Sequence, residues 1–491
     1  MKKIQLIAAL VLVVIALCSC SNTDYQKVIP ANATLVVKAD LKSVSEKADF
    51  KHSKMMKMLD ASLVAMVKGK DLKTVKGYID DPMKMGIDFS MPLYLFMMGE
   101  DTFGLTMKMN DEGDVKDFLQ LLNKQGMASK PQEKNGLMCG TLLDDIYYSY
   151  DKNTFLLLAS MSGKGTSTTS KLARELMALK EDDSFISTEA YDRMNAEDED
   201  LVTYTNGKLG KDLLSEVLSA LMPTSVDVKD IDALLSLNFE NGKASFKTKV
   251  WGKTDKAQAM LDEADKNFGT IEGKYIERMS DNAVIWMGTN VKGEWALSKL
   301  KESKSTKEML FMLERAVDIE QMLRAVDGDV ALELQMKNFD PENAPEYMVY
   351  AELKNSDFLA DVNDWKESMK DYGMTMRDKG ENQYVLTMDD ESYLWGVQDK
   401  NLFFSSANAI QGKGTKSLDA QKSDIKNSKC YIYVDMEKVP LVDFAKSAGM
   451  SFLVGPLKKL QSAVLKSASA NEVTLTIELK DKNENFLKQL L

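Results

Sequence analysis

The residues best placed for chemistry lie near the start of the chain, where an apolar run meets a polar stretch. Lys2 and Lys3 precede the apolar run 6–17, and Leu17-Cys18-Ser19-Cys20 closes it. A charged start, an apolar middle and a small residue before Cys form a lipobox, at which a signal peptide is cleaved and the Cys thiol is acylated. The run is shorter than the roughly 20 residues that a transmembrane helix needs. We predict a signal peptide at 1–19 and a tether at 20–23, held in the membrane by acyl chains such as palmitate on Cys20.

Two further cysteines, Cys139 and Cys430, lie in apolar stretches. A free Cys behaves as a small buried hydrophobe, which is the interpretation we adopt. A disulfide between them stays open, because an oxidising compartment would permit one.

Histidine chemistry has one candidate, because His52 is the only histidine in the chain. Any His-based triad or multi-histidine metal site would have to use it. Its surroundings, Lys51-His52-Ser53-Lys54, indicate a solvated position on an amphipathic helix. We therefore predict no catalytic residue here.

Two Gly-Lys-Gly-Thr turns, at 163–166 and 412–415, resemble a phosphate cradle. A P-loop has Gly five residues before its Gly-Lys pair and Ser or Thr directly after it. Leu158 and Ala407 occupy the first place, and Gly occupies the second in both turns. We predict ordinary loops that lead into helices, and no cofactor.

Acidic and sulfur-bearing groups could bind metals. The acidic clusters are Asp144-Asp145, Glu197-Asp198-Glu199-Asp200 and Asp389-Asp390-Glu391, and the methionines group at Met55-Met56/Met58, Met97-Met98 and Met107/Met109. The acidic clusters lack the EF-hand pattern, so solvated turns are favoured, with weak calcium binding left open. The methionines lack neighbouring His or Cys, so core filling is favoured over copper binding. We predict no metal site.

Composition excludes one class of partner. The chain has 491 residues, 44% of them hydrophobic, and a net charge of −12. Such an acidic chain lacks the Lys/Arg excess that neutralises phosphates, so we predict no nucleic-acid binding.

The chain repeats its pattern once. Residues 25–42 and 275–292 both start with Tyr and share an Asn-Ala pair (Asn32-Ala33 and Asn282-Ala283). Asp151-Lys152-Asn153 recurs as Asp399-Lys400-Asn401, each followed by an apolar segment and a Gly-Lys-Gly-Thr turn. Because the period is far longer than that of a solenoid, we predict two tandem copies at 24–268 and 272–491, joined by a linker at 269–271.

Within a copy, the spacing predicts an α+β fold. Alternating apolar residues predict strands at 35–39, 235–239 and 473–479, and Asn241-Gly242 predicts a hairpin tip. Residues 114–124 and 357–370 begin acidic and end in Lys, which suits the helix dipole. The sequence therefore predicts antiparallel sheets with helices packed on one face.

The opening Val28-Ile29-Pro30-Ala31-Asn32-Ala33-Thr34-Leu35-Val36-Val37, behind a lipobox, resembles a family of Bacteroidota lipoproteins known only as a domain of unknown function. The resemblance implies an envelope lipoprotein and supplies no catalytic residues.

Two hypotheses follow. The first is a non-enzymatic envelope lipoprotein that binds or scaffolds an unknown protein or glycan; the second is a hydrolase built on carboxylates. Because Ser21 rather than Asp follows Cys20, we expect outer-membrane residence. Surface export in Bacteroidota resembles a rule that requires acidic residues close behind the acylated Cys, and this chain has only one there. The periplasmic face of the membrane is therefore favoured, and the choice between the two faces stays open.

Overall fold

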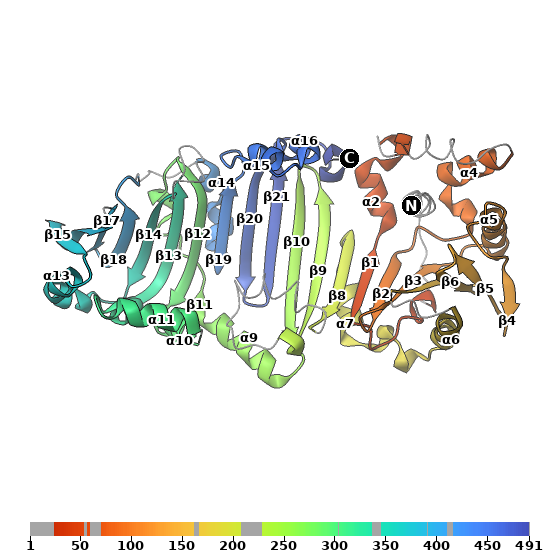
Figure 1. The fold of residues 1–491 in the computed structure, drawn as a ribbon, viewed down its shortest axis with the longest axis horizontal. Coiled ribbons are helices and arrows are strands. Elements are labelled where there is room, and N and C mark those ends of the chain that lie inside the picture. The colour runs from red at the N-terminus through yellow and green to blue at the C-terminus, as the bar shows by residue number, and fades with distance from the viewer. Residues whose placement is uncertain are drawn as a thin grey trace. The chain divides into compact units, whose positions relative to one another are not determined.

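The computed structural model describes residues 24–53, 56–58, 70–161, 166–207, 228–302, 304–335, 345–389, 391–409 and 416–490. The chain divides into two compact units, whose helices and strands are labelled in Figure 1. Unit 1 comprises Met1–Asp212, Asp232–Phe246 and Asp481–Leu491, and unit 2 comprises Leu213–Ile231 and Lys247–Lys480. The segment Asp481–Leu491 therefore belongs to unit 1, whereas the predicted second repeat runs from 272 to 491. The predicted repeat boundaries stay a prediction.

Unit 1 is built from short helices and antiparallel strands. Its elements are η1 (Asp24–Gln26), β1 (Leu35–Ala39), α2 (Leu41–Ala48), η2 (Phe50–His52), α4 (Lys70–Asp80), η3 (Pro82–Met85), β2 (Leu93–Met98), β3 (Thr102–Lys108), α5 (Glu112–Lys124), β4 (Gln132–Lys134), β5 (Leu137–Leu142), β6 (Ile146–Tyr150), β7 (Thr154–Ser160), α6 (Thr166–Met177), η4 (Glu181–Asp183), η5 (Phe185–Ser187), α7 (Glu189–Asn195), β8 (Leu201–Asn206), β9 (Ile231–Glu240), the first part of β10 (Lys243–Gly252) and α17 (Phe486–Leu490).

The strands of unit 1 pair in the order β9-β8-β1-β2-β3-β7-β6-β5-β4, and every pairing is antiparallel. Directly paired residues share a face of the sheet, which makes Val37, Leu95, Leu105, Leu157 and Tyr148 one row across β1, β2, β3, β7 and β6. Helix α5 packs on this face with Tyr148 and Tyr150. Helix α6 lies against β6 and β7, and η1 lies against β3 and β7.

Both faces of β6 and β7 are buried, because helices cover the unit 1 sheet on each side. Tyr147 and Tyr148 follow one another in β6 and point to opposite faces, yet both are buried. In β7, Leu156 and Leu158 on one face and Phe155 on the other are buried as well. The predicted helical layer is present, and a second layer joins it. Near the C-terminal end, α17 packs on α2, and the rings of Phe486 and Phe239 stack at 6.2 Å.

Unit 2 also mixes helices and antiparallel strands. Its elements are η6 (Val228–Asp230), the second part of β10, α9 (Asp255–Asn267), β11 (Phe268–Gly269), η7 (Ile276–Arg278), β12 (Ala283–Lys292), α10 (Gly293–Leu300), α11 (Lys304–Leu313), α12 (Ile319–Ala325), β13 (Val326–Gln335), β14 (Glu346–Leu353), η8 (Asp357–Asp361), α13 (Val362–Lys370), β15 (Thr375–Gly380), β16 (Gln383–Met388), β17 (Glu391–Gln398), β18 (Asn401–Ser406), α14 (Lys416–Lys426), β19 (Cys430–Asp435), α15 (Leu441–Ser447), η9 (Ser451–Leu453), α16 (Val454–Leu457), β20 (Leu460–Ser469) and β21 (Glu472–Leu479).

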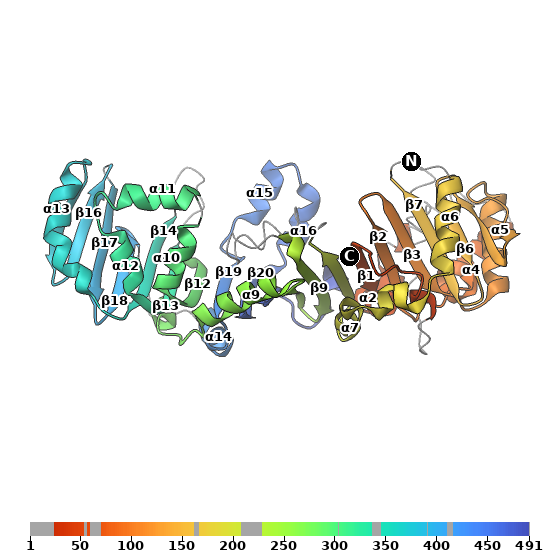
Figure 2. The ribbon, with the colours of Figure 1, turned by 90° about the horizontal axis from the view of Figure 1, so that it is seen from below.

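The strand order of unit 2 is β21-β20-β19-β12-β13-β14-β18-β17-β16-β15, with β11 beside the end of β12. Helix α13 packs with one core cluster, contacts β15 and lies near β16 and β17 in Figure 2. Helix α14 contributes Leu418 and Ile425 to a second cluster. Replacing β12 to β20 by β1 to β9 in sequence order reproduces the unit 1 order strand for strand. The shared order agrees with a duplication.

The predicted elements are largely confirmed. The α+β class, the strands β1, β9 and β21 and the helix α5 are all present, and 357–370 divides into η8 and α13. Asn241 and Gly242 separate β9 from β10, and Gly242 has the positive φ of 67° that such a turn requires. The apolar stripe Leu213/Leu214/Val217/Leu218/Leu221, at helical spacing, predicts a helix at 212–222, which lies outside the described residues.

The local start signals follow helix-capping chemistry. The Asp111 side chain accepts a hydrogen bond from the Asp114 backbone N–H at the start of α5. Thr254 caps α9 in the same way through Ala257 N–H. Such caps satisfy backbone donors that the start of a helix leaves unpaired, and they determine where α5 begins. The apolar residues of α5 then determine which of its faces packs on the sheet.

Candidate functional site, an apolar cavity in unit 1

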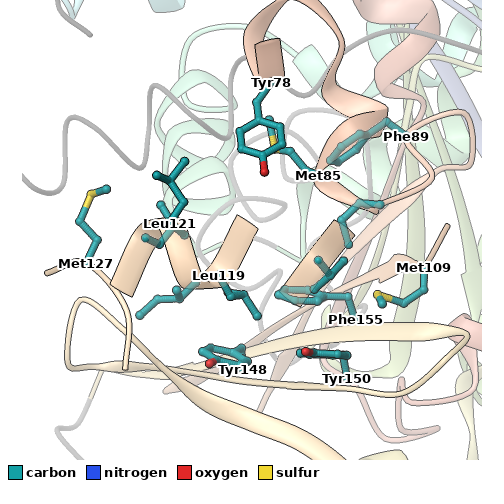
Figure 3. Packing of buried hydrophobic residues seen from close by; sticks show 14 of the residues in the cluster. Tyr78, Met85, Phe89, Met109, Leu119, Leu121, Met127, Tyr148, Tyr150 and Phe155 are labelled. Atoms are coloured by element: carbon teal, nitrogen blue, oxygen red, sulfur yellow. The ribbon is translucent and has the colours of Figure 1, made fainter. Parts of the chain in front are cut away.

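A cavity of about 120 Å³ lies in unit 1, between α5 and the sheet, and it is partly open to solvent. Helix α5 presents one stripe of apolar side chains to it at helical spacing. The stripe consists of Val115, Phe118, Leu119 and Leu122. Leu119 is fully buried and Val115 almost so, which fixes this wall of the cavity. Figure 3 shows Leu119 of α5 beside Tyr148, Tyr150 and Phe155 from the strands.

The sheet supplies the opposite wall. Its lining residues come from strands that are neighbours in the sheet but distant in the chain: Leu93 on β2, Leu105 and Met107 on β3, and Phe155 and Leu157 on β7. Met85 of η3, with Ile87 and Phe89, closes a third side. Every lining residue is apolar.

The chemistry of this lining decides what can occupy the cavity. A buried water needs two to four polar partners, and a cavity lined by Leu, Ile and Phe stays dry. An engineered cavity of roughly 150 Å³ with such a lining binds benzene or xenon. The unit 1 cavity is of similar size, so its walls favour a small apolar group and offer no general acid, base or nucleophile.

Two tyrosines next to the cavity complete the core without entering the lining. The Tyr148 hydroxyl donates to the Ser129 carbonyl at 3.3 Å, and the missing side chain of Gly140 leaves room for that hydroxyl. The Tyr150 hydroxyl has no hydrogen-bond partner among the described residues. Burial raises the pKa of Tyr150 to about 12, so both phenols are neutral near pH 7.

Unit 2 has a counterpart to this region. Val37 and Met287 each lie five residues beyond the Asn of the shared Asn-Ala pair, and each starts a row of directly paired residues. The unit 1 row is Val37, Leu95, Leu105, Leu157, Tyr148 and Gly140. The unit 2 row is Met287, Leu332, Val349, Phe404, Trp395 and Tyr384.

Aromatic rings fill the unit 2 counterpart. The ring centroids of Tyr384 and Trp395 lie 4.7 Å apart, and those of Trp395 and Trp365 lie 6.1 Å apart. Trp365 also stacks on Phe358 of η8 at 6.2 Å. These rings pack in one buried cluster with Leu402 and Phe404.

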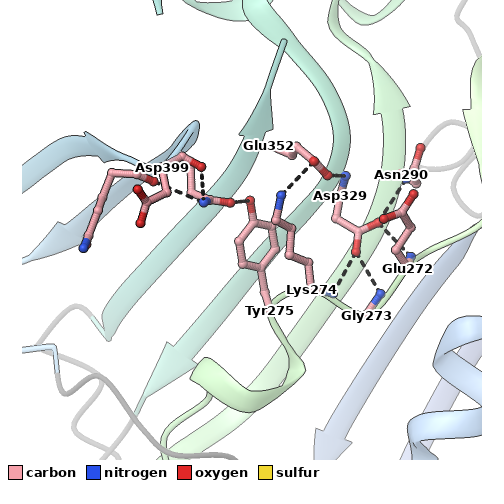
Figure 4. A network of polar contacts seen from close by, with 10 residues as sticks. Glu272, Gly273, Lys274, Tyr275, Asn290, Asp329, Glu352 and Asp399 are labelled. Atoms are coloured by element: carbon pink, nitrogen blue, oxygen red, sulfur yellow. Dashed lines mark hydrogen bonds and ion pairs between the residues drawn. The ribbon is translucent and has the colours of Figure 1, made fainter. Parts of the chain in front are cut away.

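A polar network in unit 2 serves structure. The Asp329 carboxylate, 1% exposed, accepts hydrogen bonds from the backbone N–H groups of Glu272, Gly273 and Lys274 at 2.8 to 3.0 Å (Figure 4). The Asn290 amide donates to it at 3.0 Å. With four donors this carboxylate is fully engaged, and it holds the segment that leads into η7 against β13.

Glu333 is a buried carboxyl without such compensation. It is 2% exposed and receives hydrogen bonds at Oε1 from Ser280 N–H at 3.0 Å and Gln335 Nε2 at 2.7 Å. Its Oε2 has no partner among the described residues. Burial raises the pKa of Glu333 to about 7 against these hydrogen bonds and nearby Lys438.

The structure separates the residues that could do chemistry. Cys20 and the Gly-Lys-Gly part of both turns lie outside the described residues. Cys139 is buried in unit 1 and Cys430 half-buried in unit 2, and both are free thiols. His52 ends a 3₁₀ turn rather than lying on an amphipathic α-helix, and its exposed ring contacts the Asp49 carboxylate at 2.7 Å.

The acidic clusters do not converge. Asp144 and Asp145 form the turn between β5 and β6, Asp389 lies in the turn between β16 and β17, and Asp390 lies outside the described residues. Buried Asp200 is held by Lys47 at 2.8 Å and by the Phe239 backbone N–H at 2.7 Å. Within the described ranges, no three His, Cys, Asp or Glu side chains gather closely enough to hold a metal ion. No described helix is both long and apolar enough to cross a bilayer.

Sequence reasoning missed the cavity. Of its lining residues, only Met107 belongs to a group that the sequence singles out, and there it is expected to fill the core. The sequence carries only a weak signal for the cavity. Unit 1 has Gly140 and Leu157 at positions where unit 2 has the aromatic residues Tyr384 and Phe404. Only the strand pairing makes those positions equivalent.

Comparison with known proteins gives one family. A family model described as a domain of unknown function (DUF4836) matches residues 25–446. No curated protein matches. Crystal forms III and I of TP0453 are similar over 51% and 50% of this chain and 90% and 87% of theirs, at 8% and 9% identity and TM-scores of 0.29 and 0.25.

Proposed function

We propose a function for this chain, which belongs to the DUF4836 family: it is a non-enzymatic lipoprotein of the cell envelope that binds a small apolar ligand in unit 1. The observation that carries the proposal is the cavity of about 120 Å³ with its wholly apolar lining. An occupant that binds only the folded chain would stabilise the fold.

The anchoring part of the proposal rests on sequence. The lipobox at Leu17-Cys18-Ser19-Cys20 supports acylation of Cys20, and the opening after it resembles Bacteroidota lipoproteins. Ser21 directly behind Cys20 supports residence in the outer membrane. The single acidic residue close behind Cys20 favours the periplasmic face of that membrane. Several acyl chains on one Cys would anchor the chain far more firmly than a single myristoyl group.

The non-enzymatic part rests on the walls of the site. A hydrolase needs carboxylates or a nucleophile at the reacting bond. The cavity presents hydrocarbon and thioether groups, and buried Asp200 is engaged by Lys47 and a backbone N–H. Binding is therefore the activity that this site supports best.

Acylation is tested by metabolic labelling with a fatty-acid analogue. We expect label on the wild-type protein and none on Cys20→Ala, which should accumulate as precursor. Label on Cys20→Ala would contradict the anchor. Proteinase treatment of intact cells tests the face: we expect the protein to survive together with a periplasmic control.

Binding is tested on the mature chain carrying Cys20→Ala, exported behind a cleavable signal peptide and labelled with ¹³C at the methionine methyl groups. Met85 and Met107 line the cavity, so cyclohexane should shift their resonances. Leu122→Phe fills the lining and should abolish these shifts. Its neighbour Leu121 is equally buried but does not line the cavity, so Leu121→Phe should preserve them. Unchanged Met85 and Met107 resonances with every probe would refute the proposal.

A further inference from the structure

We infer that the ligand is the tail of a linear alkyl chain, carried by a lipid or fatty acid that is not covalently attached to the protein. This inference rests on the binding function proposed above and names the chemical class of its ligand. It is drawn from the size of the cavity, the exposure of one of its walls and the position of the N-terminal segment.

Size and polarity restrict the ligand to part of a larger molecule or to a very small one. A cavity of about 120 Å³ cannot enclose a whole lipid. Its lining offers no partner to a carboxylate or phosphate, and an unpaired buried polar group is strongly disfavoured. A lipid could therefore place only its hydrocarbon end inside, with its polar head in solvent.

The sheet wall provides a path from the cavity to solvent. Leu157 and Leu105 line the cavity, Leu105 pairs directly with Leu95, and Leu95 pairs with Val37. Leu105 and Leu157 are half-buried, and Leu95 is 36% exposed. The apolar surface therefore continues outward along one row of the sheet. An extended chain would cover this row, whereas a compact ring would occupy the enclosed part alone.

The walls also tolerate a flexible guest. Met85 and Met107 lie on different sides of the cavity, and methionine side chains adapt to irregular shapes. No lining residue can orient a ligand by hydrogen bonding. The cavity would therefore select among ligands by the length and cross-section of their hydrocarbon chains.

The acyl chains proposed on Cys20 are the competing occupant. The Thr106 hydroxyl donates to the Tyr25 carbonyl at 2.7 Å, and Thr106 points to the face opposite its neighbours Leu105 and Met107. The sheet thus lies between Tyr25 and the cavity. A chain attached before Tyr25 would have to pass around the sheet, for example past β6, β5 and β4, to enter the cavity, whereas a free chain enters from the cavity's own face.

The experiment measures n-alkyl carboxylates of increasing length, with benzene and cyclohexane for comparison, by calorimetry and by the Met85 and Met107 methyl resonances. The protein is the exported mature chain with Cys20→Ala. Each buried methylene should tighten binding about four-fold until the path is filled. Leu95→Asp places a charge on the path and should weaken the long carboxylates at least ten-fold while leaving benzene unchanged. Met161→Asp, at an exposed site of unit 1 that does not line the cavity, should weaken neither.

Three results would overturn the inference. If benzene and cyclohexane bind but affinity does not depend on chain length, the alkyl assignment fails and the apolar binding site stands. If no probe moves Met85 or Met107, the binding function fails as well. If the acylated wild-type protein already shows the ligand-bound resonances after delipidation and accepts no added chain, the occupant is the Cys20 acyl group.

Discussion

The cores of the two units differ in what fills the same place. In unit 1 the row of paired residues ends in Tyr148 and Gly140, and in unit 2 it ends in Trp395 and Tyr384. Phe404 stands where unit 1 has Leu157. In this row unit 2 therefore has three rings, those of Phe404, Trp395 and Tyr384, and unit 1 has one, that of Tyr148, beside its cavity. Strand order thus sets the frame, and side-chain volume influences how completely the core of that frame is filled.

This difference gives the cavity a physical meaning. Protein interiors are packed like organic crystals, and a void forfeits contacts on all its walls. The unit 2 counterpart shows that the frame tolerates a filled core. A cavity kept in one of two equivalent frames therefore supports the binding that we propose for unit 1.

The largest effect is expected where unit 2 is most tightly filled. Trp395→Ala removes a ring that contacts Tyr384 and Trp365, and it should lower the free energy of unfolding by about 3 to 5 kcal/mol. Denaturant titration followed by the remaining tryptophans measures this change. The half-exposed Tyr372 provides a control, since Tyr372→Ala should change stability by less than about 0.5 kcal/mol. A loss below about 1 kcal/mol for Trp395→Ala would mean that the aromatic cluster is loosely packed.

In unit 1, Leu119→Ala should enlarge the existing cavity. We expect a loss of about 3 kcal/mol, and saturating ligand should recover part of it, roughly 2.7 kcal/mol at one hundred times Kd. Scanning calorimetry with and without an apolar ligand measures both quantities. Stability that does not respond to ligand would separate the cavity from binding.

The next contrast concerns the residue beside Leu332 on β13, which is Glu333. The equivalent residue of β2, beside Leu95, is Phe96. The pKa of Glu333 is raised to about 7, so the native state keeps a proton that the unfolded state loses near pH 4.5. Stability should therefore be fully present below about pH 4.5 and fall as pH rises to 7, by about 2 kcal/mol between pH 5 and 8. Urea titrations across this range should show the slope in the wild type and lose it in Glu333→Gln. The same slope in both proteins would assign it to another group.

The smallest effect concerns the partner of Phe96. A Cβ on Gly104 would lie 2.1 Å from the Phe96 ring, so Gly104→Ala should cost about 1 to 2 kcal/mol through overpacking. Gly77 in α4 has no neighbour within 4 Å of such a Cβ and provides the matched control. Gly77→Ala should be neutral or stabilise by up to about 1 kcal/mol, since Ala favours helix. Thermal unfolding of the two variants compares them.

The sequence predicts the local elements well and the site poorly. Periodicity and the Asn241-Gly242 pair are local signals, and they predict β9, β10 and α5 correctly. The cavity depends on Leu93, Met107 and Leu157 becoming neighbours through pairing of β2, β3 and β7, which no local pattern encodes. Glu333 gave no such signal: it shares a strand face with Asp329, Ala331 and Gln335, and alternation with Val330, Leu332 and Leu334 would place that face in solvent. The acylation of Cys20 stays a prediction.

The docking of α17 on α2 has a consequence for synthesis. Lys488 lies 3.5 Å from Asp49, and Phe486 stacks on Phe239, so Asp481–Leu491 completes a unit whose strands end with the first part of β10. Chains emerge from the ribosome with their N-terminal end first. Unit 1 is therefore begun first and finished last, after all of unit 2 has been made. A chain interrupted before this segment would leave the side of α2 that receives α17 uncovered, and Phe239 without the ring that stacks on it.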